Sequence, residues 1–194
     1  MLKKFSSFML FMVFLVSVFG LSGCQNNKQT SAIGKVDLFA RIESQITYPI
    51  YGEINVSARI NTNKPFYGFE ILAQTQSAEP QHVTMTIYKF VTDIKTTLAE
   101  KDIVKSQKFD NVHNGNWLYL QSSELEPGEY LLLVSSTSEN FFMDRQDIVP
   151  ELAGKVAFGY SGSVISDGAF PFRLLYASSE IEGLTIGSYL ENIG

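Results

Sequence analysis

The sequence predicts an all-β fold, a single antiparallel β-sandwich with a jelly-roll-like arrangement. Apolar residues alternate with polar ones in short segments along much of the chain, and this period of two is typical of half-buried strands. Clusters of Asn, Asp, Gly and Pro separate the segments and supply turns. Only Met143–Gly154 has a helical pattern, and Pro150 limits its length. Many short strands at similar spacing favour a sandwich over a mixed fold.

The expected strands are rich in β-branched and aromatic residues, which pack well on a pleated surface. In chain order they are Glu53–Ile60, Tyr67–Ala73, Val83–Ile87, Asp102–Phe109, Asn116–Gln121, Glu129–Ser135, Lys155–Tyr160 and Phe172–Ala177. In the second of them Tyr67, Phe69 and Ile71 fall on one face, so we expect all three on the core side.

The beginning of the chain has the pattern of a signal peptide. A basic start at Lys3 and Lys4 precedes an apolar stretch over residues 5–19. This stretch is short for a transmembrane helix, which needs on the order of 20 apolar residues. The sequence LSGC at residues 21–24 resembles the lipobox of bacterial lipoproteins. That resemblance implies cleavage before Cys24 and lipidation of its thiol, with palmitate among the anchoring acyl chains.

This interpretation divides the chain into three parts. They are a signal peptide over residues 1–23, the lipidated Cys24 with a flexible linker over residues 24–35, and a β-sandwich domain over residues 36–194. The linker residues are polar and small, with no apolar period that could pack. Two alternatives for the N-terminus are an uncleaved transmembrane anchor and an ordinary signal peptide with a chance cysteine. We expect the lipoprotein form, held by its lipid at the extracytoplasmic face of the cell membrane, exposed at the cell surface.

Composition narrows the classes of partner. Cys24 is the only cysteine, so the mature domain has no disulfide and depends on its own core. The formal net charge is −5, and loss of Lys3 and Lys4 with the signal peptide makes the mature chain more acidic. An acidic domain argues against nucleic acid, which needs a basic face. It also argues against binding of anionic lipid by the domain itself.

The segment from Tyr67 to Ala177 resembles a known kind of domain. Its motifs are Tyr88-Lys89-Phe90, Thr97-Leu98-Ala99, Trp117-Leu118 and Pro127-Gly128-Glu129-Tyr130. They are similar to those of the β-sandwich, carbohydrate-binding-like modules of bacterial surface glycosidases and lipoproteins. The resemblance implies a sandwich fold, a hairpin at the Thr-Leu-Ala motif and a glycan as ligand. Such modules carry a tryptophan where this chain has residues 131–133, Leu-Leu-Leu, which implies a reduced binding platform.

Catalytic motifs are not found in the sequence, and we predict a protein that is not an enzyme. A serine triad needs a histidine, and the chain has two, His82 and His113, neither near a G-x-S-x-G or H-E-x-x-H motif. A glycosidase needs two carboxylates across a cleft, and no acidic pair stands in a recognisable context. No cofactor motif is present either.

A candidate ligand-binding shelf lies at the lone tryptophan. Period two places Trp117, Tyr119 and Gln121 on one face of a strand and Leu118 and Leu120 on the other. If the leucines face the core, the rings form an exposed shelf on which sugar C–H faces can stack, next to an amide that hydrogen-bonds hydroxyls. The alternative is that Trp117 belongs to the core, as large aromatic side chains commonly do.

A second candidate is a structural calcium ion in the polar turn over residues 110–116. Asp110 and Asn114 supply the oxygen ligands that calcium accepts. The spacing does not match an EF-hand loop, and Asn-Gly turns are also common in hairpins. A hairpin turn without metal is therefore the alternative.

Taken together, these features predict a membrane-anchored, extracytoplasmic lipoprotein whose sandwich is a non-catalytic binding module for carbohydrate. A structural or protein-interaction lipoprotein, with an envelope protein as partner, is the alternative. A hydrolase with an unrecognised acidic pair is a third hypothesis.

Overall fold

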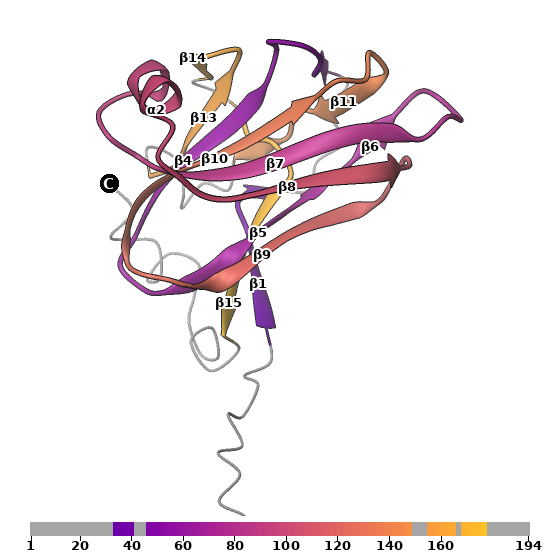
Figure 1. The fold of residues 1–194 in the computed structure, drawn as a ribbon. Helices are drawn as coiled ribbons and strands as arrows, with labels where there is room; N and C mark the ends of the chain where they lie inside the picture. The colour runs from indigo at the N-terminus through magenta and orange to yellow at the C-terminus, as the bar shows by residue number, and fades with distance from the viewer. Residues whose placement is uncertain (1–32, 41–45, 149–154, 166–167, 178–194) are drawn as a thin grey trace, which may run out of the picture. The chain divides into compact units, whose positions relative to one another are not determined.

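The computed structural model describes residues 33–40, 46–148, 155–165 and 168–177 (Figure 1). All of them belong to one compact unit, Ala32–Gly194. The expected signal peptide, Cys24 and the expected linker up to residue 32 lie outside the described residues.

The fold is all-β, as the alternation of apolar and polar residues predicts. The strands are β1 (Ile33–Asp37), β2 (Phe39–Ala40), β3 (Thr47–Pro49), β4 (Val56–Thr62), β5 (Phe66–Leu72), β6 (Gln74–Thr75), β7 (Gln81–Lys89), β8 (Ile103–Val112), β9 (Trp117–Leu125), β10 (Gly128–Ser136), β11 (Phe141–Asp144), β12 (Asp147–Ile148), β13 (Ala157–Tyr160), β14 (Ser163–Ile165) and β15 (Phe172–Ala177). A strand is found in every segment for which the sequence predicts one. Within the described ranges the single helix is α2 (Ile94–Glu100).

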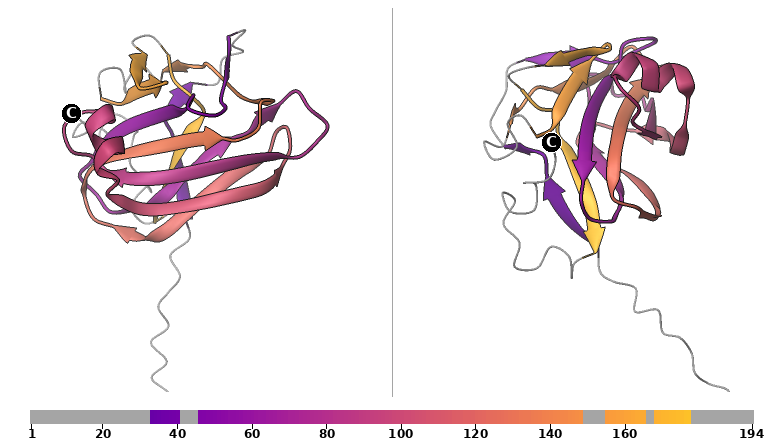
Figure 2. Two further views of the ribbon diagram at one scale, coloured as in Figure 1. Left: turned by 45° about the horizontal axis from the view of Figure 1, so that its top comes forward. Right: turned by 90° about the vertical axis from the view of Figure 1, so that its left-hand side faces the viewer.

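The strands form two main antiparallel sheets. One has four strands in the order β1-β15-β5-β9, and the other has six in the order β14-β13-β4-β10-β7-β8. Two smaller sheets, β3-β11-β6 and β12-β2, adjoin them. In the left view of Figure 2 the six-stranded sheet lies in front of the four-stranded sheet, so the domain has the two layers of a sandwich.

The core lies between the two main sheets. The ring of Phe66 on β5 meets that of Tyr130 on β10, with centroids 5.1 Å apart. Phe158 on β13 and Phe172 on β15 make a second contact between the sheets, with centroids 6.3 Å apart. Because successive side chains on a strand alternate, each sheet also presents an outer face, directed away from this core.

The expected core face of β5 is wrong at Tyr67. Phe66 is fully buried in its place, while Tyr67 is half-buried. The pairing of β5 with β9 shifts register at this point: Phe66 pairs with Leu125 and Gly68 with Gln121, so two steps along β5 correspond to four along β9. Phe66 and Phe69 are three residues apart and both enter the core, so the alternation is interrupted here and holds only from Phe69 onward.

The helix stands where the sequence analysis did not place one. The expected helix Met143–Gly154 is wrong over its described part, because Met143 is fully buried in β11 and β12 follows. Residues 149–154 lie outside the described residues. In β11 the side chains at Phe141 and Met143 both enter the core at period two, a signal that the helical interpretation overlooked.

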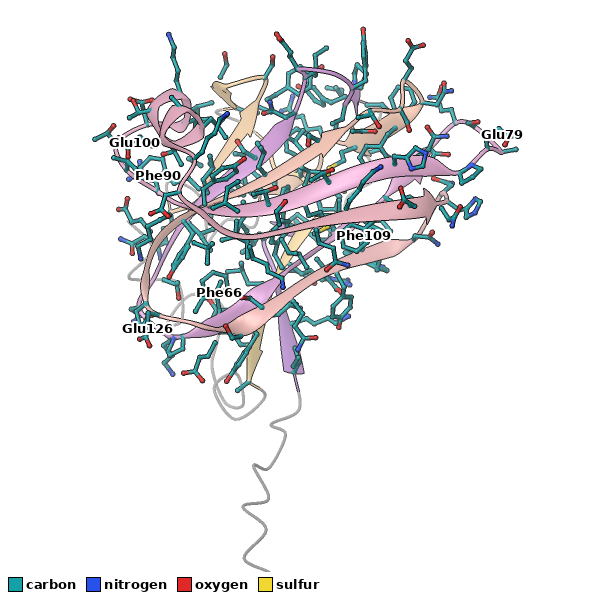
Figure 3. The ribbon with its side chains drawn as sticks, viewed as in Figure 1. Phe66, Glu79, Phe90, Glu100, Phe109 and Glu126 are labelled. Carbon is teal, nitrogen blue, oxygen red and sulfur yellow. The ribbon has the colours of Figure 1, made fainter. Side chains whose placement is uncertain are left out.

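The hairpin expected at Thr97-Leu98-Ala99 is also wrong, since these residues lie in α2. The helix begins because the Asp93 carboxylate accepts the backbone N–H of Thr96, at 2.7 Å from Oδ1. It ends at Lys101, whose φ of 56° is left-handed. Ile94 packs with Phe90 and Leu131 on the outer face of the six-stranded sheet, and Phe90 lies beside α2 in Figure 3.

The domain begins earlier than expected. β1 starts at Ile33, inside the range 24–35 that the sequence analysis assigns to the linker, and Ile33 pairs with Ala177 of β15. This strand was not predicted because the stretch is mostly polar. β1 has only five residues and lies at the edge of its sheet.

Candidate functional site

Trp117, Tyr119 and Gln121 lie together on the outer face of the four-stranded sheet. Leu118 and Leu120 point the other way and are 7% and 0% exposed. Tyr119 is 37% exposed and Gln121 is exposed, whereas Trp117 is half-buried. The period-two prediction of which residues share a face therefore agrees with the structure, and Trp117 falls between the two alternatives of open shelf and core.

Tyr119 ends a row of polar side chains that crosses all four strands of the sheet. Tyr119 on β9 stands opposite Glu70 on β5, and Glu70 stands opposite Arg173 on β15. Arg173 in turn stands opposite Asp37 on β1. Directly paired residues on neighbouring antiparallel strands share a face, so the row lies on the outer face with the candidate shelf.

Ion pairs join four charged residues on this face, and we call this set the charged row: Lys35, Asp37, Glu70 and Arg173. Arg173 Nη1 donates to Glu70 Oε1 at 2.9 Å, and Arg173 Nε donates to Asp37. Lys35 Nζ donates to the other oxygen of Glu70 at 2.9 Å. The Glu70 side chain is 0% exposed, so this carboxylate has exchanged its hydration for two cations.

These contacts raise the pKa of both cations, Lys35 and Arg173. The hydrogen bond to Glu70 raises the pKa of Lys35 above its ordinary value, although burial acts against it. Burial also acts to lower the pKa of Arg173, but the hydrogen bonds to Glu70 and Asp37 outweigh it and raise that pKa. Both side chains are therefore fixed cations at neutral pH.

Each aromatic ring of the shelf rests against one of these cations. The guanidinium carbon of Arg173 lies 3.6 Å from the centroid of the Trp117 ring. Lys35 Nζ lies 4.8 Å from the centroid of the Tyr119 ring. Both distances are within the range of cation–π interactions, which favour a fixed geometry of ring and cation.

The outer face thus combines apolar rings with polar groups of several kinds. Trp117 and Tyr119 offer ring surface, and the exposed amide of Gln121 both donates and accepts hydrogen bonds. The side chains of Lys35 and Asp37 are 39% and 40% exposed, so they add a donor and an acceptor at the surface. This is the chemistry of a site for a polar ligand with apolar faces.

The charged row was not predicted from the sequence, although a signal was present. Glu70 and Arg173 each stand alone in an apolar strand, within GFEIL and FRLL. Charged residues are rarely buried unless they are paired, so a lone charge in such a strand predicts a partner of opposite sign on a neighbouring strand. The partner itself is set by strand order, which the sequence does not display.

The candidate calcium residues Asp110 and Asn114 each have a protein partner. Asp110 Oδ1 lies 2.6 Å from His82 Nδ1 and 3.4 Å from Lys108 Nζ. The hydrogen bond from His82 is the main cause that holds the pKa of Asp110 below its ordinary value. Asn114 Oδ1 accepts the backbone N–H of Thr75 at 3.1 Å. Over the described residues, no group of three or more His, Cys, Asp or Glu side chains is placed to hold a metal ion.

The motif Pro127-Gly128-Glu129-Tyr130 has a structural part in the fold. The hydroxyl of Tyr130 donates to the carbonyl of Glu126 at 2.7 Å, while its ring packs in the core. Glu129 pairs with Arg59 on β4. The motif therefore contributes to the turn between β9 and β10.

Comparison of the chain with models of protein families and with curated proteins found no match. Among the described residues, no helix has the length and apolar character needed to cross a membrane.

Proposed function

We propose that this protein is a lipid-anchored, extracytoplasmic lipoprotein whose sandwich domain binds carbohydrate without catalysing a reaction. The observation that carries the proposal is the outer face of the four-stranded sheet, where Trp117 and Tyr119 stand beside Gln121 and the exposed groups of Lys35 and Asp37. The resemblance of the chain to carbohydrate-binding-like modules supports the same ligand class.

The physical argument concerns the two surfaces of a sugar ring. Its C–H faces are apolar and lose water at little cost against an aromatic ring, whereas its hydroxyls need donors and acceptors at the rim. Tyr119 keeps 37% of its surface in solvent and so has ring area for such a contact. The exposed amide and charged groups then set the orientation of the sugar.

A glycan array probed with the full chain in detergent micelles tests this proposal, in calcium and in chelator. We expect retention on one class of glycan, loss of retention with Tyr119→Ala, and no effect of chelator. Tyr51→Ala is the matched control, because Tyr51 is a comparably exposed aromatic residue, 42% exposed, outside the four-stranded sheet. The absence of any retained glycan, or equal retention by Tyr119→Ala, would contradict the proposal.

The anchor has its own test. Cys24→Ser should abolish incorporation of labelled palmitate and block processing of the precursor, because the thiol is the expected attachment point. Membrane-bound mature protein of normal size from this variant would contradict the lipoprotein assignment.

A second candidate function is a structural or protein-interaction lipoprotein. The observation that favours it is β8, an edge strand of ten residues that is exposed over most of its length. A free strand edge can pair with an extended segment of another protein. An empty glycan array, together with one envelope protein cross-linked in cells through Val104 and not through Tyr51, would favour this candidate.

A further inference from the structure

The contact between Arg173 and Trp117 has the geometry of a support for the indole ring. The guanidinium carbon of Arg173 lies over one face of the Trp117 ring, 3.6 Å from its centroid, and so is in van der Waals contact with that face. A planar guanidinium can stack on an indole over its whole width, which an ammonium group cannot do.

The support is itself held at two of its edges. Glu70, with its side chain 0% exposed, accepts from Nη1, and Asp37 accepts from Nε. The second oxygen of Glu70 is occupied by Lys35 Nζ at 2.9 Å. The Arg173 side chain is only 10% exposed, so its plane cannot turn without breaking these bonds.

We infer that Arg173 is a positioning residue for the carbohydrate-binding face: held by Glu70 and Asp37, it closes one face of the Trp117 indole and fixes the ring in a single orientation. The exposed remainder of the ring is then the surface offered to a saccharide. Because the ring is ordered before binding, the entropy cost of immobilising it is removed from the binding free energy. This last consequence rests on the proposed function, whereas the positioning itself is a property of the protein without ligand.

The six-stranded sheet contains a matched arrangement that serves as a control. Arg59 lies 4.1 Å from the centroid of the Phe90 ring and pairs with Glu129 at 3.0 Å. Arg59→Lys therefore removes a guanidinium stacked on an aromatic ring and held by a carboxylate, as Arg173→Lys does, but away from Trp117.

The test uses the full chain in detergent micelles, with Trp117 as its own probe because it is the only tryptophan. We compare acrylamide quenching, emission wavelength and near-ultraviolet circular dichroism in wild type, Arg173→Lys and Arg59→Lys. Lysine keeps the charge that Glu70 and Asp37 need but not the planar stack. We expect the quenching constant to rise about twofold in Arg173→Lys, because the second ring face opens to solvent, with a red-shifted emission and loss of the indole dichroism. Arg59→Lys should match wild type.

Asp37→Asn is a milder variant in case Arg173→Lys does not fold, and it should change quenching in the same direction by less. Unchanged quenching and dichroism in both folded variants would overturn the inference. Glycans retained by the wild-type protein on the array should be lost by Arg173→Lys and kept by Arg59→Lys. If wild type retains no glycan, the proposed function fails, while the spectroscopic comparison still decides whether Arg173 positions the ring.

Discussion

A side chain at Gly68 would collide with Leu120: a Cβ built there stands 2.0 Å from the carbonyl oxygen of Leu120. The φ of Gly68 is 125°, a conformation that residues with side chains rarely adopt. Gly68 directly follows the register shift between β5 and β9 and pairs with Gln121, so this close approach lies beside the candidate shelf.

Gly68→Ala should therefore destabilise the domain strongly. We expect a loss of about 3 kcal/mol or more, since backbone strain is joined by overlap with a main-chain atom that cannot move aside. Gly115→Ala is the control, because Gly115 has a φ of 79° but nothing within 4 Å of its Cβ position. It should cost about 1–2 kcal/mol, the intrinsic cost of a left-handed conformation. Urea unfolding of both variants measures the difference, and equal losses would contradict the steric explanation.

Trp117→Ala should have an intermediate effect on stability. The residue is half-buried and one ring face is covered by Arg173. We expect a loss of about 2 kcal/mol, above the 0.5 kcal/mol typical of surface changes and below the 3–5 kcal/mol of a fully buried tryptophan. Thermal or urea unfolding measures this loss. A value near either limit would show that Trp117 is simply exposed or simply core.

Glu70→Gln should destabilise the domain more than a comparable change at a surface pair. The substitution leaves the nearly buried Arg173 without its buried counter-charge, and breaking such a pair costs about 3–5 kcal/mol. The control is Glu129→Gln, since the Arg59–Glu129 pair is 39% and 32% exposed and should contribute no more than about 1 kcal/mol. Chemical denaturation of the two variants provides the comparison. Similar losses would mean that Glu70 has no special role in joining the strands.

Asp93 should make the stability of the domain depend on pH in acid. Hydrogen bonds from the Thr96 backbone and side chain lower the pKa of Asp93 below the ordinary value of 3.8. A carboxyl group whose pKa is lower in the folded state stabilises fully above its unfolded pKa, and this contribution is lost as pH falls through the folded value. Asp93→Asn keeps a capping side chain without a titrating charge, so wild type should lose its advantage over this variant in that acid range. NMR titration of the Asp93 carboxyl carbon measures the pKa, and a value at or above 3.8 would refute the capping explanation.

Lys105 and Lys108 should protect the free edge of β8 from pairing with other chains. Both stand in an exposed edge strand beside Ile103 and Val104, which are 49% and 38% exposed. Charged residues on an edge strand discourage edge-to-edge association. We expect the double variant Lys105→Val, Lys108→Val to self-associate in sedimentation velocity. Lys95→Val on α2 removes a positive charge without freeing a strand edge and should remain unchanged.

The all-β class and the positions of the long strands followed from the sequence because they depend on local patterns. Alternation at period two requires only that one face of a strand be buried, whichever strand lies beside it. For the same reason, the shared face of Trp117, Tyr119 and Gln121 could be predicted from their spacing alone. The helix α2 could also have been predicted, since Asp93 directly before the apolar Ile94 is a typical N-cap signal.

The register shift before Gly68 and the charged row were decided only by the tertiary structure. Whether Phe66 or Tyr67 enters the core depends on how β5 pairs with β9, which the residues of β5 do not specify by themselves. Likewise, Asp37, Glu70 and Arg173 are far apart in the chain and meet because β1, β15 and β5 are neighbours in one sheet. Strand order arises from the packing of the whole core, and so does the degree of exposure of Trp117. The sequence therefore determined that Trp117, Tyr119 and Gln121 share one face of β9, and the assembled sheet determined that a buried ion pair would cover one side of the tryptophan ring.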